Sequence, residues 1–227
     1  MQKRFMSVSL LSIALAGTLL TGCGSSNESS DKQQASTPQN DQQQSAQAKE
    51  DGKYTKPPEM KIDKNKEYTA TIQTNKGDIK IKLFDNEAPI TVNNFVFLAR
   101  DKFYDNVKFH RVIKEFMIQT GDPLGNGRGG PGYRFQDELP PVKPYAKGIV
   151  AMANAGQNTN GSQFFIGSGD QVANLNQQPN YTVFGEVVEG MDTVDKIASV
   201  KVEASETGEP SAPVEDVHIN TVTIEEK

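Results

Sequence analysis

The stretch FHRVIKEFMIQTGD, from Phe109 to Asp122, places a histidine and an arginine directly before an apolar run that ends in glutamine, glycine and aspartate. No nucleophile and no group of metal ligands lies near this arginine, Arg111, in the sequence. A guanidinium cannot lose its proton in a protein, so Arg111 is a poor general base but a dependable electrostatic group. The pattern therefore indicates chemistry in which a permanent cation works beside an apolar surface.

Alternating apolar residues around this stretch predict a mainly β domain. Residues 68–72 and 79–83 alternate on either side of a turn, Asn75-Lys76-Gly77, which predicts a β-hairpin. Further short apolar runs are separated by loops rich in glycine and asparagine, and we expect each of them to form a strand. These runs are VKFHRVI, FMIQTG, GIVAMAN, SQFFIG and YTVFGEVV.

Two apolar stripes at helical spacing predict two amphipathic helices, the first of which starts at Pro89, a favourable first-turn residue. The stripes consist of Val92, Phe95, Val96 and Ala99, and of Met191, Val194, Ile197 and Ala198. A last strand carries Val217 and Ile219, then Val222 and Ile224, and this slip of phase indicates a β-bulge. Many short strands with two helices predict a closed, mainly antiparallel barrel whose ends the helices cover.

The N-terminus has the layout of a secretory signal over residues 1–22. Lys3 and Arg4 precede an apolar segment from about Val8 to Leu20, which is short for a membrane span. A buried helix is the alternative for this apolar segment, but a helix in a protein core would not need a cationic start and an abrupt polar end. Leu20-Thr21-Gly22-Cys23 resembles the lipobox of bacterial lipoproteins, so we expect acylation of Cys23, the single cysteine of the chain. The expected location is the cell membrane, lipid-anchored, on its extracytoplasmic side.

Residues 23–60 follow as the lipidated cysteine and a polar tether, which we expect to be disordered because it shows no apolar periodicity. Residues 61–227 form the expected folded domain, with a monomer as the simplest state. The formal net charge of -5 argues against a nucleic-acid partner, because nonspecific binding to phosphates needs a basic surface.

Three stretches in this order resemble the cyclophilins: FHRVIKEFMIQTGD, GIVAMANAGQNTNGSQFFI and YTVFGEVVEGMDTVDKI. The resemblance covers residues 68–226, and it implies a peptidyl-prolyl cis-trans isomerase with an eight-stranded barrel, two capping helices and no cofactor. It also implies X-Pro segments of unfolded or exported proteins as partners.

Matched position by position, the resemblance implies that Arg111 is the catalytic arginine. His110 matches a family position without being a catalytic group, and we expect it to be a hydrogen-bonded structural imidazole. Asn154 is implied to anchor the substrate backbone, and residues 127–130 resemble the loop beside a neighbouring side-chain pocket. The implied substrate-binding residues are Phe116, Met117, Gln119, Ala153, Asn154, Ala155, Gln163, Phe165, Leu175 and Tyr181.

The chain departs from the family pattern at the outer rim of the implied pocket. Asn174 stands where many cyclophilins carry tryptophan, and the connection NQQPN before Tyr181 is longer than usual. Tryptophan offers a large apolar face and an N–H donor, so we expect cyclosporin to bind with weakened affinity.

Other functions fit the sequence less well. His110 and His218 stand in no motif with ligand spacing, so we expect no metal site. Ser162 and Ser168 do not lie in a G-x-S-x-G motif, which argues against a serine hydrolase. The main alternative to the enzyme is a lipid-anchored proline-peptide binding or adhesion module without turnover. Arg111 favours the enzyme, because binding needs only the apolar pocket, whereas catalysis also needs a donor.

Overall fold

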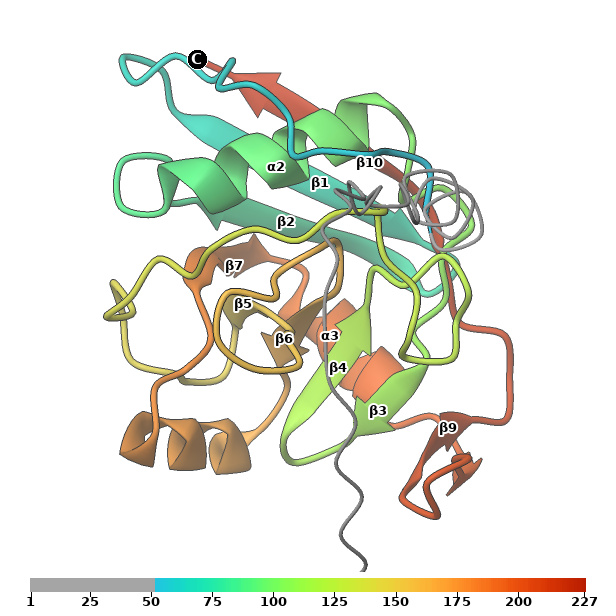
Figure 1. Cartoon of the computed structure of the whole chain (residues 1–227). Helices are drawn as coiled ribbons and strands as arrows, with labels where there is room; N and C mark the ends of the chain where they lie inside the picture. The colour runs from blue at the N-terminus through green and yellow to red at the C-terminus, as the bar shows by residue number, and fades with distance from the viewer. Residues whose placement is uncertain (1–51) are drawn as a thin grey trace, which may run out of the picture. The chain divides into compact units, whose positions relative to one another are not determined.

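The computed structural model describes residues 52–227, and the expected signal segment, Cys23 and most of the predicted tether lie outside them. An eight-stranded antiparallel sheet dominates this part, in the order β10-β1-β2-β7-β5-β6-β4-β3 (Figure 1). Its strands are β1 (Tyr68–Thr74), β2 (Gly77–Leu83), β3 (Arg111–Ile113), β4 (Met117–Thr120), β5 (Ile149–Met152), β6 (Phe164–Gly167), β7 (Val183–Glu189) and β10 (Ile219–Glu226). The mainly β prediction is confirmed.

The sheet is curled but open, so the prediction of a closed barrel is wrong. Its edge strands, β3 and β10, share no ladder. The residues before each of them meet at a single bridge, between Lys108 and His218. Because this bridge is antiparallel, the residues that follow Lys108 lie opposite those that precede His218, so β3 and β10 run away from each other on either side of the bridge.

Both predicted helices are confirmed, as α2 (Pro89–Arg100) and α3 (Met191–Ala198). The predicted bulge is confirmed too, because Gln73 pairs with Thr221 and Thr74 with Ile219, which leaves Asn220 as the extra residue. Two elements were not predicted: the 3-10 helix η1 (Asp170–Gln177) and a separate hairpin of β8 (Val202–Ala204) and β9 (Pro210–Pro213). Both are polar, and η1 has one buried residue, Val172. No helix among residues 52–227 has the length and apolar character to cross a bilayer.

Strand alternation separates two apolar clusters on the two faces of β4, β5 and β6. One face contributes Ile118, Phe164 and Val150 to the main core, which α2 also lines with Val92 and Phe95. The other face carries Met117, Phe165 and Ala151, which form a smaller cluster with Tyr145 and Val183. This second cluster places apolar side chains beside Arg111.

The chain packs against the domain earlier than the predicted start at residue 61. The ring of Tyr54 lies 5.1 Å from that of Phe97 on α2, and the Tyr54 N–H donates to the Pro131 carbonyl at 2.8 Å. Farther along, the Lys61 N–H donates to Asn93 Oδ1 at 2.8 Å. Tyr54 is a single aromatic residue in a polar segment and produces no periodic pattern. The sequence therefore predicted that this segment belongs to the tether.

Candidate active site

Register brings the site residues together on one face of four neighbouring strands. Arg111 on β3 pairs with Gln119 on β4, and Gln119 pairs with Phe165 on β6, which pairs with Ala151 on β5. Directly paired residues point to the same side of a sheet. The cation, an amide and an aromatic ring therefore lie side by side, although up to 54 positions of sequence separate them.

A cavity of about 760 Å³ opens on this face. Its floor is formed by Met117 and Phe165, which are 1% and 4% exposed, and its walls by the half-buried Phe116, Leu175 and Tyr181. The ring of Tyr181 stands edge-on to that of Phe165, with centroids 5.7 Å apart. The cavity has the apolar lining that suits a small ring, and Arg111 stands at its side.

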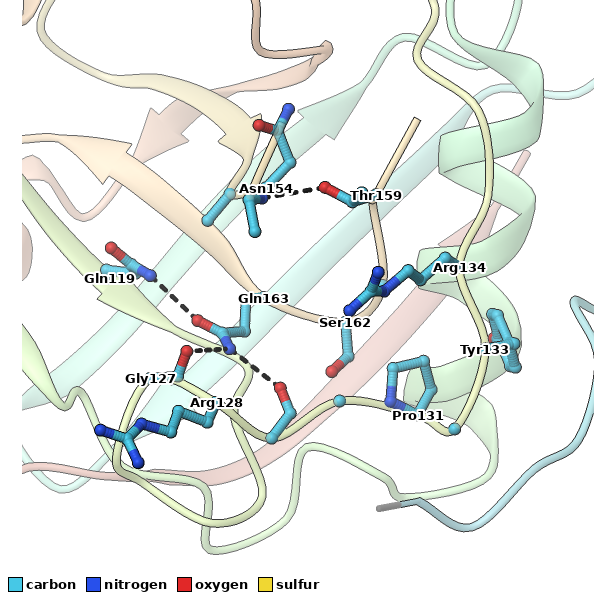
Figure 2. A pocket seen from close by; sticks show the side chains of 16 residues that line it. Gln119, Gly127, Arg128, Pro131, Tyr133, Arg134, Asn154, Thr159, Ser162 and Gln163 are labelled. Carbon is cyan, nitrogen blue, oxygen red and sulfur yellow. Dashed lines mark hydrogen bonds between the residues drawn. The ribbon is translucent and has the colours of Figure 1, made fainter. Parts of the chain in front are cut away.

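A second cavity, of about 800 Å³, adjoins the first and shares Gln119, Ala153 and Asn154 with it. Gln119 donates through Nε2 to Gln163 Oε1, and Gln163 Nε2 donates to the Gly127 carbonyl (Figure 2); these bonds measure 3.0 and 3.1 Å. Gln163 Nε2 also donates to the Gly129 carbonyl at 2.9 Å. These bonds fix both glutamines between strand β4 and the loop of residues 125–130. The two cavities form one extended groove.

The last residues of the opening stretch hold that loop in place. Gly121 lies in the left-handed region at φ 86°, and a Cβ there would stand 2.3 Å from the Ser162 carbonyl oxygen. The buried carboxylate of Asp122 accepts from the N–H groups of Leu124 and Asn126 at 2.8 and 3.0 Å. Gly121 and Asp122 therefore fix the loop that follows them in sequence, and this loop forms one wall of the groove.

Asn154 lies where the two cavities meet, on a short loop after β5. Its side chain donates to the Asn180 carbonyl at 3.0 Å and accepts from the Gly156 N–H at 3.3 Å. Among residues 52–227, no hydrogen bond uses the Asn154 backbone N–H or carbonyl, so both are open to an extended peptide. The backbone N–H of its neighbour Ala155 donates to Thr159 Oγ1 at 2.9 Å, and Ala155 lines the second cavity.

Helix η1 supplies the outer wall of the first cavity. The side chain of Asn176 pins the helix to Tyr145, with two hydrogen bonds of 2.9 Å to its backbone. The Tyr145 hydroxyl donates to the Tyr181 carbonyl at 2.7 Å, which fixes the opposite wall. Leu175 faces the cavity, whereas Asn174 is exposed and does not line it.

Arg111 is held by a carboxylate that the sequence analysis missed. Its Nε donates to Glu209 Oε2 at 2.6 Å and its Nη2 to Glu209 Oε1 at 2.8 Å, while Nη1 lies 3.5 Å from Gln119 Oε1. The hydrogen bonds raise the pKa of Arg111 and lower the pKa of Glu209. Glu209 lies in the β8–β9 hairpin, 98 residues from its partner, and no sequence pattern connects the two.

The prediction of a hydrogen-bonded structural imidazole at His110 is wrong. Within the described part of the chain, neither ring nitrogen has a hydrogen-bond partner, although both are buried. Burial lowers the pKa of His110, so the imidazole is neutral at neutral pH. The ring lines the first cavity beside residues 125–127.

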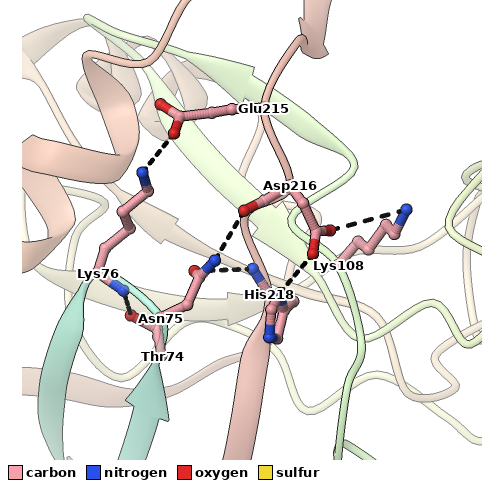
Figure 3. A network of polar contacts seen from close by, with 7 residues as sticks. All are labelled: Thr74, Asn75, Lys76, Lys108, Glu215, Asp216 and His218. Atoms are coloured by element: carbon pink, nitrogen blue, oxygen red, sulfur yellow. Dashed lines mark hydrogen bonds and ion pairs between the residues drawn. The ribbon is translucent and has the colours of Figure 1, made fainter.

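A polar network holds the segment that leads into Arg111 (Figure 3). Asp216 lies 3.7 Å from Lys108 Nζ and 2.9 Å from His218 Nδ1, and its carbonyl accepts from the Asn75 side chain at 2.7 Å. The Thr120 hydroxyl donates to the Lys108 carbonyl at 2.9 Å. These contacts join the open edges of the sheet where β3 begins.

All of the groove residues that the family resemblance implied line one or both cavities, and their roles stay predictions. The structure adds Glu209 and the tip of its hairpin, residues 205–207, to the lining of the first cavity. No three histidine, cysteine, aspartate or glutamate side chains of residues 52–227 form a group that could hold a metal ion. Together, the fold and the cavities define an extended groove with an apolar pocket and a fixed cation.

Comparison with known proteins shows the family of this chain. Residues 69–224 match the model of the cyclophilin type peptidyl-prolyl cis-trans isomerases. Peptidyl-prolyl cis-trans isomerase A of Mycobacterium tuberculosis is 46% identical over 177 residues, which cover 69% of this chain and 91% of that protein. Peptidyl-prolyl cis-trans isomerase-like 3 of Gallus gallus is also 46% identical, over 68% of this chain and 94% of its own length.

Solved structures agree with this match. A cyclophilin type isomerase of Cryptosporidium parvum superposes with a TM-score of 0.64 and 34% identity, covering 70% of this chain and 98% of that one. A second structure of it, in the presence of the dipeptide Ala-Pro, gives a TM-score of 0.63. The chain belongs to the cyclophilin-type peptidyl-prolyl cis-trans isomerases, which favours the enzyme over a binding module without turnover.

Proposed function

We propose that Arg111 lowers the barrier to X-Pro rotation by donating a hydrogen bond to the prolyl nitrogen. Twisting the peptide bond removes amide resonance and returns a lone pair to that nitrogen. A fixed donor therefore stabilises the twisted state more than either planar isomer. The observation that carries this proposal is the position of the guanidinium, anchored beside the apolar pocket of Phe116, Met117 and Phe165.

The barrier reduction that catalysis requires is of the size that one donor and one apolar pocket can supply. Without a catalyst, an X-Pro bond isomerises in tens to hundreds of seconds. A turnover of up to about 10³ s⁻¹ requires roughly 7 kcal/mol of stabilisation. One preorganised donor supplies about 2.7–4 kcal/mol. The pocket supplies the rest by holding the ring while the preceding carbonyl rotates, with the Asn154 backbone as its anchor. The related structure in the presence of Ala-Pro supports a proline-containing peptide as the substrate.

We propose further that the isomerase assists the folding of exported proteins at the extracytoplasmic face of the membrane. The support is the segment LTGC, residues 20–23, at the end of a cationic and apolar start. An acylated Cys23 would anchor the chain, because each buried methylene of an acyl chain contributes about 0.8 kcal/mol. A groove that contacts mainly proline suits clients of varied sequence.

Replacing Cys23 by serine is expected to move the protein from the membrane fraction to the soluble fraction. Serine offers no thiol for acylation, whereas residues 61–227 and their isomerase activity are unaffected. Fractionation in high salt, followed by a peptide isomerisation assay on both fractions, measures the change. A matched Ser25→Ala variant controls for the altered segment. A serine variant that stayed with the membrane would contradict the lipoprotein proposal and favour an uncleaved anchor.

The rim of the pocket supports a proposal about inhibition by cyclosporin, an apolar cyclic peptide. Exposed Asn174 offers much less apolar area than the tryptophan of many cyclophilins. Loss of some 80–100 Å² of contact at about 25 cal/mol per Å² costs roughly 2–2.5 kcal/mol. That is somewhat less than a hundredfold in affinity.

Asn174→Trp is therefore expected to tighten cyclosporin inhibition by tens of fold at similar turnover, because a substrate proline sits deeper, against Phe116 and Phe165. Inhibition titrations on parent and variant measure this, with Gln177→Trp, at the last residue of η1, as a control for a nonspecific gain of apolar surface. Nanomolar inhibition of the parent would contradict this account of the rim.

A further inference from the structure

The β8–β9 hairpin brings a carboxylate to Arg111 in a fixed geometry. The Glu209 carbonyl accepts from the N–H groups of Ser205 and Ser211, both at 2.8 Å, which anchors the residue within the hairpin turn. Ser211 is 1% exposed, so this anchor is part of the packed structure. The backbone of Glu209 is therefore fixed by the hairpin, while its carboxylate accepts two hydrogen bonds from Arg111.

These two bonds occupy one edge of the guanidinium. A bidentate pair through Nε and Nη2 fixes the plane of the group as well as its position. The group carries more N–H donors than the contacts to Glu209 and Gln119 use, so hydrogens on both Nη atoms stay available. Without the carboxylate, the weak 3.5 Å contact to Gln119 would be the sole hydrogen bond of the guanidinium within the described residues.

We infer that Glu209 is a positioning residue of the isomerase, which aims the free Nη donors of Arg111 at the prolyl nitrogen. The inference rests on the proposed role of Arg111. A donor that is already oriented needs no reordering when the X-Pro bond twists, and a small misplacement of a catalytic group lowers turnover strongly. The side chains of Arg111 and Glu209 are 35% and 36% exposed, so the pair acts through its geometry more than through buried charge.

The same hairpin provides a matched control. Glu203 lies on β8, six residues before Glu209, and its side chain is exposed. It lines neither cavity and does not contact Arg111. Glu203→Gln and Glu209→Gln therefore make the same chemical change at two places of one hairpin.

Steady-state assays of the full chain with an X-Pro peptide test the inference. Glu209→Gln is expected to lower kcat about tenfold with KM within about twofold, because the amide loses the charge and one of the two acceptors. Glu209→Asp, which keeps the charge, is expected to recover part of the loss, and Glu203→Gln to stay within about twofold of the parent. An NMR spectrum of the Arg111 Nε–H should show loss of its hydrogen bond in Glu209→Gln alone.

A double-mutant cycle separates positioning from a merely structural effect. If Glu209 acts through Arg111, Glu209→Gln should have no further effect in an Arg111→Ala background. An equal tenfold loss in that background, or an unchanged kcat in the single variant, would overturn the inference while leaving the role of Arg111 intact. An unchanged kcat in Arg111→Ala itself would overturn both.

Discussion

Arg111→Ala is expected to lower kcat for an X-Pro peptide by about a hundredfold or more, with the fold intact. The loss of one preorganised donor costs about 2.7–4 kcal/mol of barrier stabilisation. The carboxylate of Glu209, 36% exposed in the parent, can be hydrated when its partner is removed, so no buried charge is left behind. Protease-free exchange NMR on the peptide measures the rate, and circular dichroism checks the fold.

Arg128→Ala is the matched control for this experiment. Arg128 lines the same cavity and also pairs with a glutamate of the β8–β9 hairpin, but its side chain is 77% exposed. Removal of a second rim cation should change kcat by less than about twofold. Arg111→Lys keeps the charge without the planar fork and should fall between parent and alanine. Equal effects of the two alanine variants would show that general charge, and not a placed donor, drives the reaction.

The family resemblance, and not the strand pattern, implied which residues surround Arg111, and alternation explains which face of its strand each of them occupies. Gln119 and Phe165 were placed beside the arginine by the family resemblance, and the pairing of β3, β4 and β6 supplies the physical reason. The face that a residue occupies on its own strand is a local property that a sequence shows, whereas the pairing of strands is not.

The parts that were not predicted depend on contacts between distant segments. Glu209 lies in the polar segment SETGEP, residues 205–210, which has no apolar alternation that would indicate a strand. The hairpin forms there because Gly208 adopts φ 84° and Ser205 closes the turn. Openness of the sheet likewise depends on a contact between distant segments, the single antiparallel bridge between Lys108 and His218, from which β3 and β10 run apart. Neither property has a periodic signature.

Phe165→Ala is expected to lower kcat/KM by about tenfold to thirtyfold and to weaken peptide binding. Phe165 belongs to the smaller apolar cluster and forms part of the pocket floor, and its ring centroid lies 5.7 Å from that of Tyr181. Loss of some 60–80 Å² of apolar contact to the proline costs roughly 1.5–2 kcal/mol. Because the ring is also part of a packed cluster, we expect a loss of stability of about 3 kcal/mol or more, so the assay needs a low temperature.

Phe164→Leu separates the two effects, because Phe164 is the neighbour of Phe165 on β6 and points into the main core. It should lower the melting temperature and leave KM within about twofold. NMR titration with an X-Pro peptide gives the affinity of each variant independently of turnover. A Phe165→Ala protein that bound the peptide as tightly as the parent, while turning it over more slowly, would show that the ring does not form the floor of the pocket. Such a ring would then act by holding Tyr181 in place.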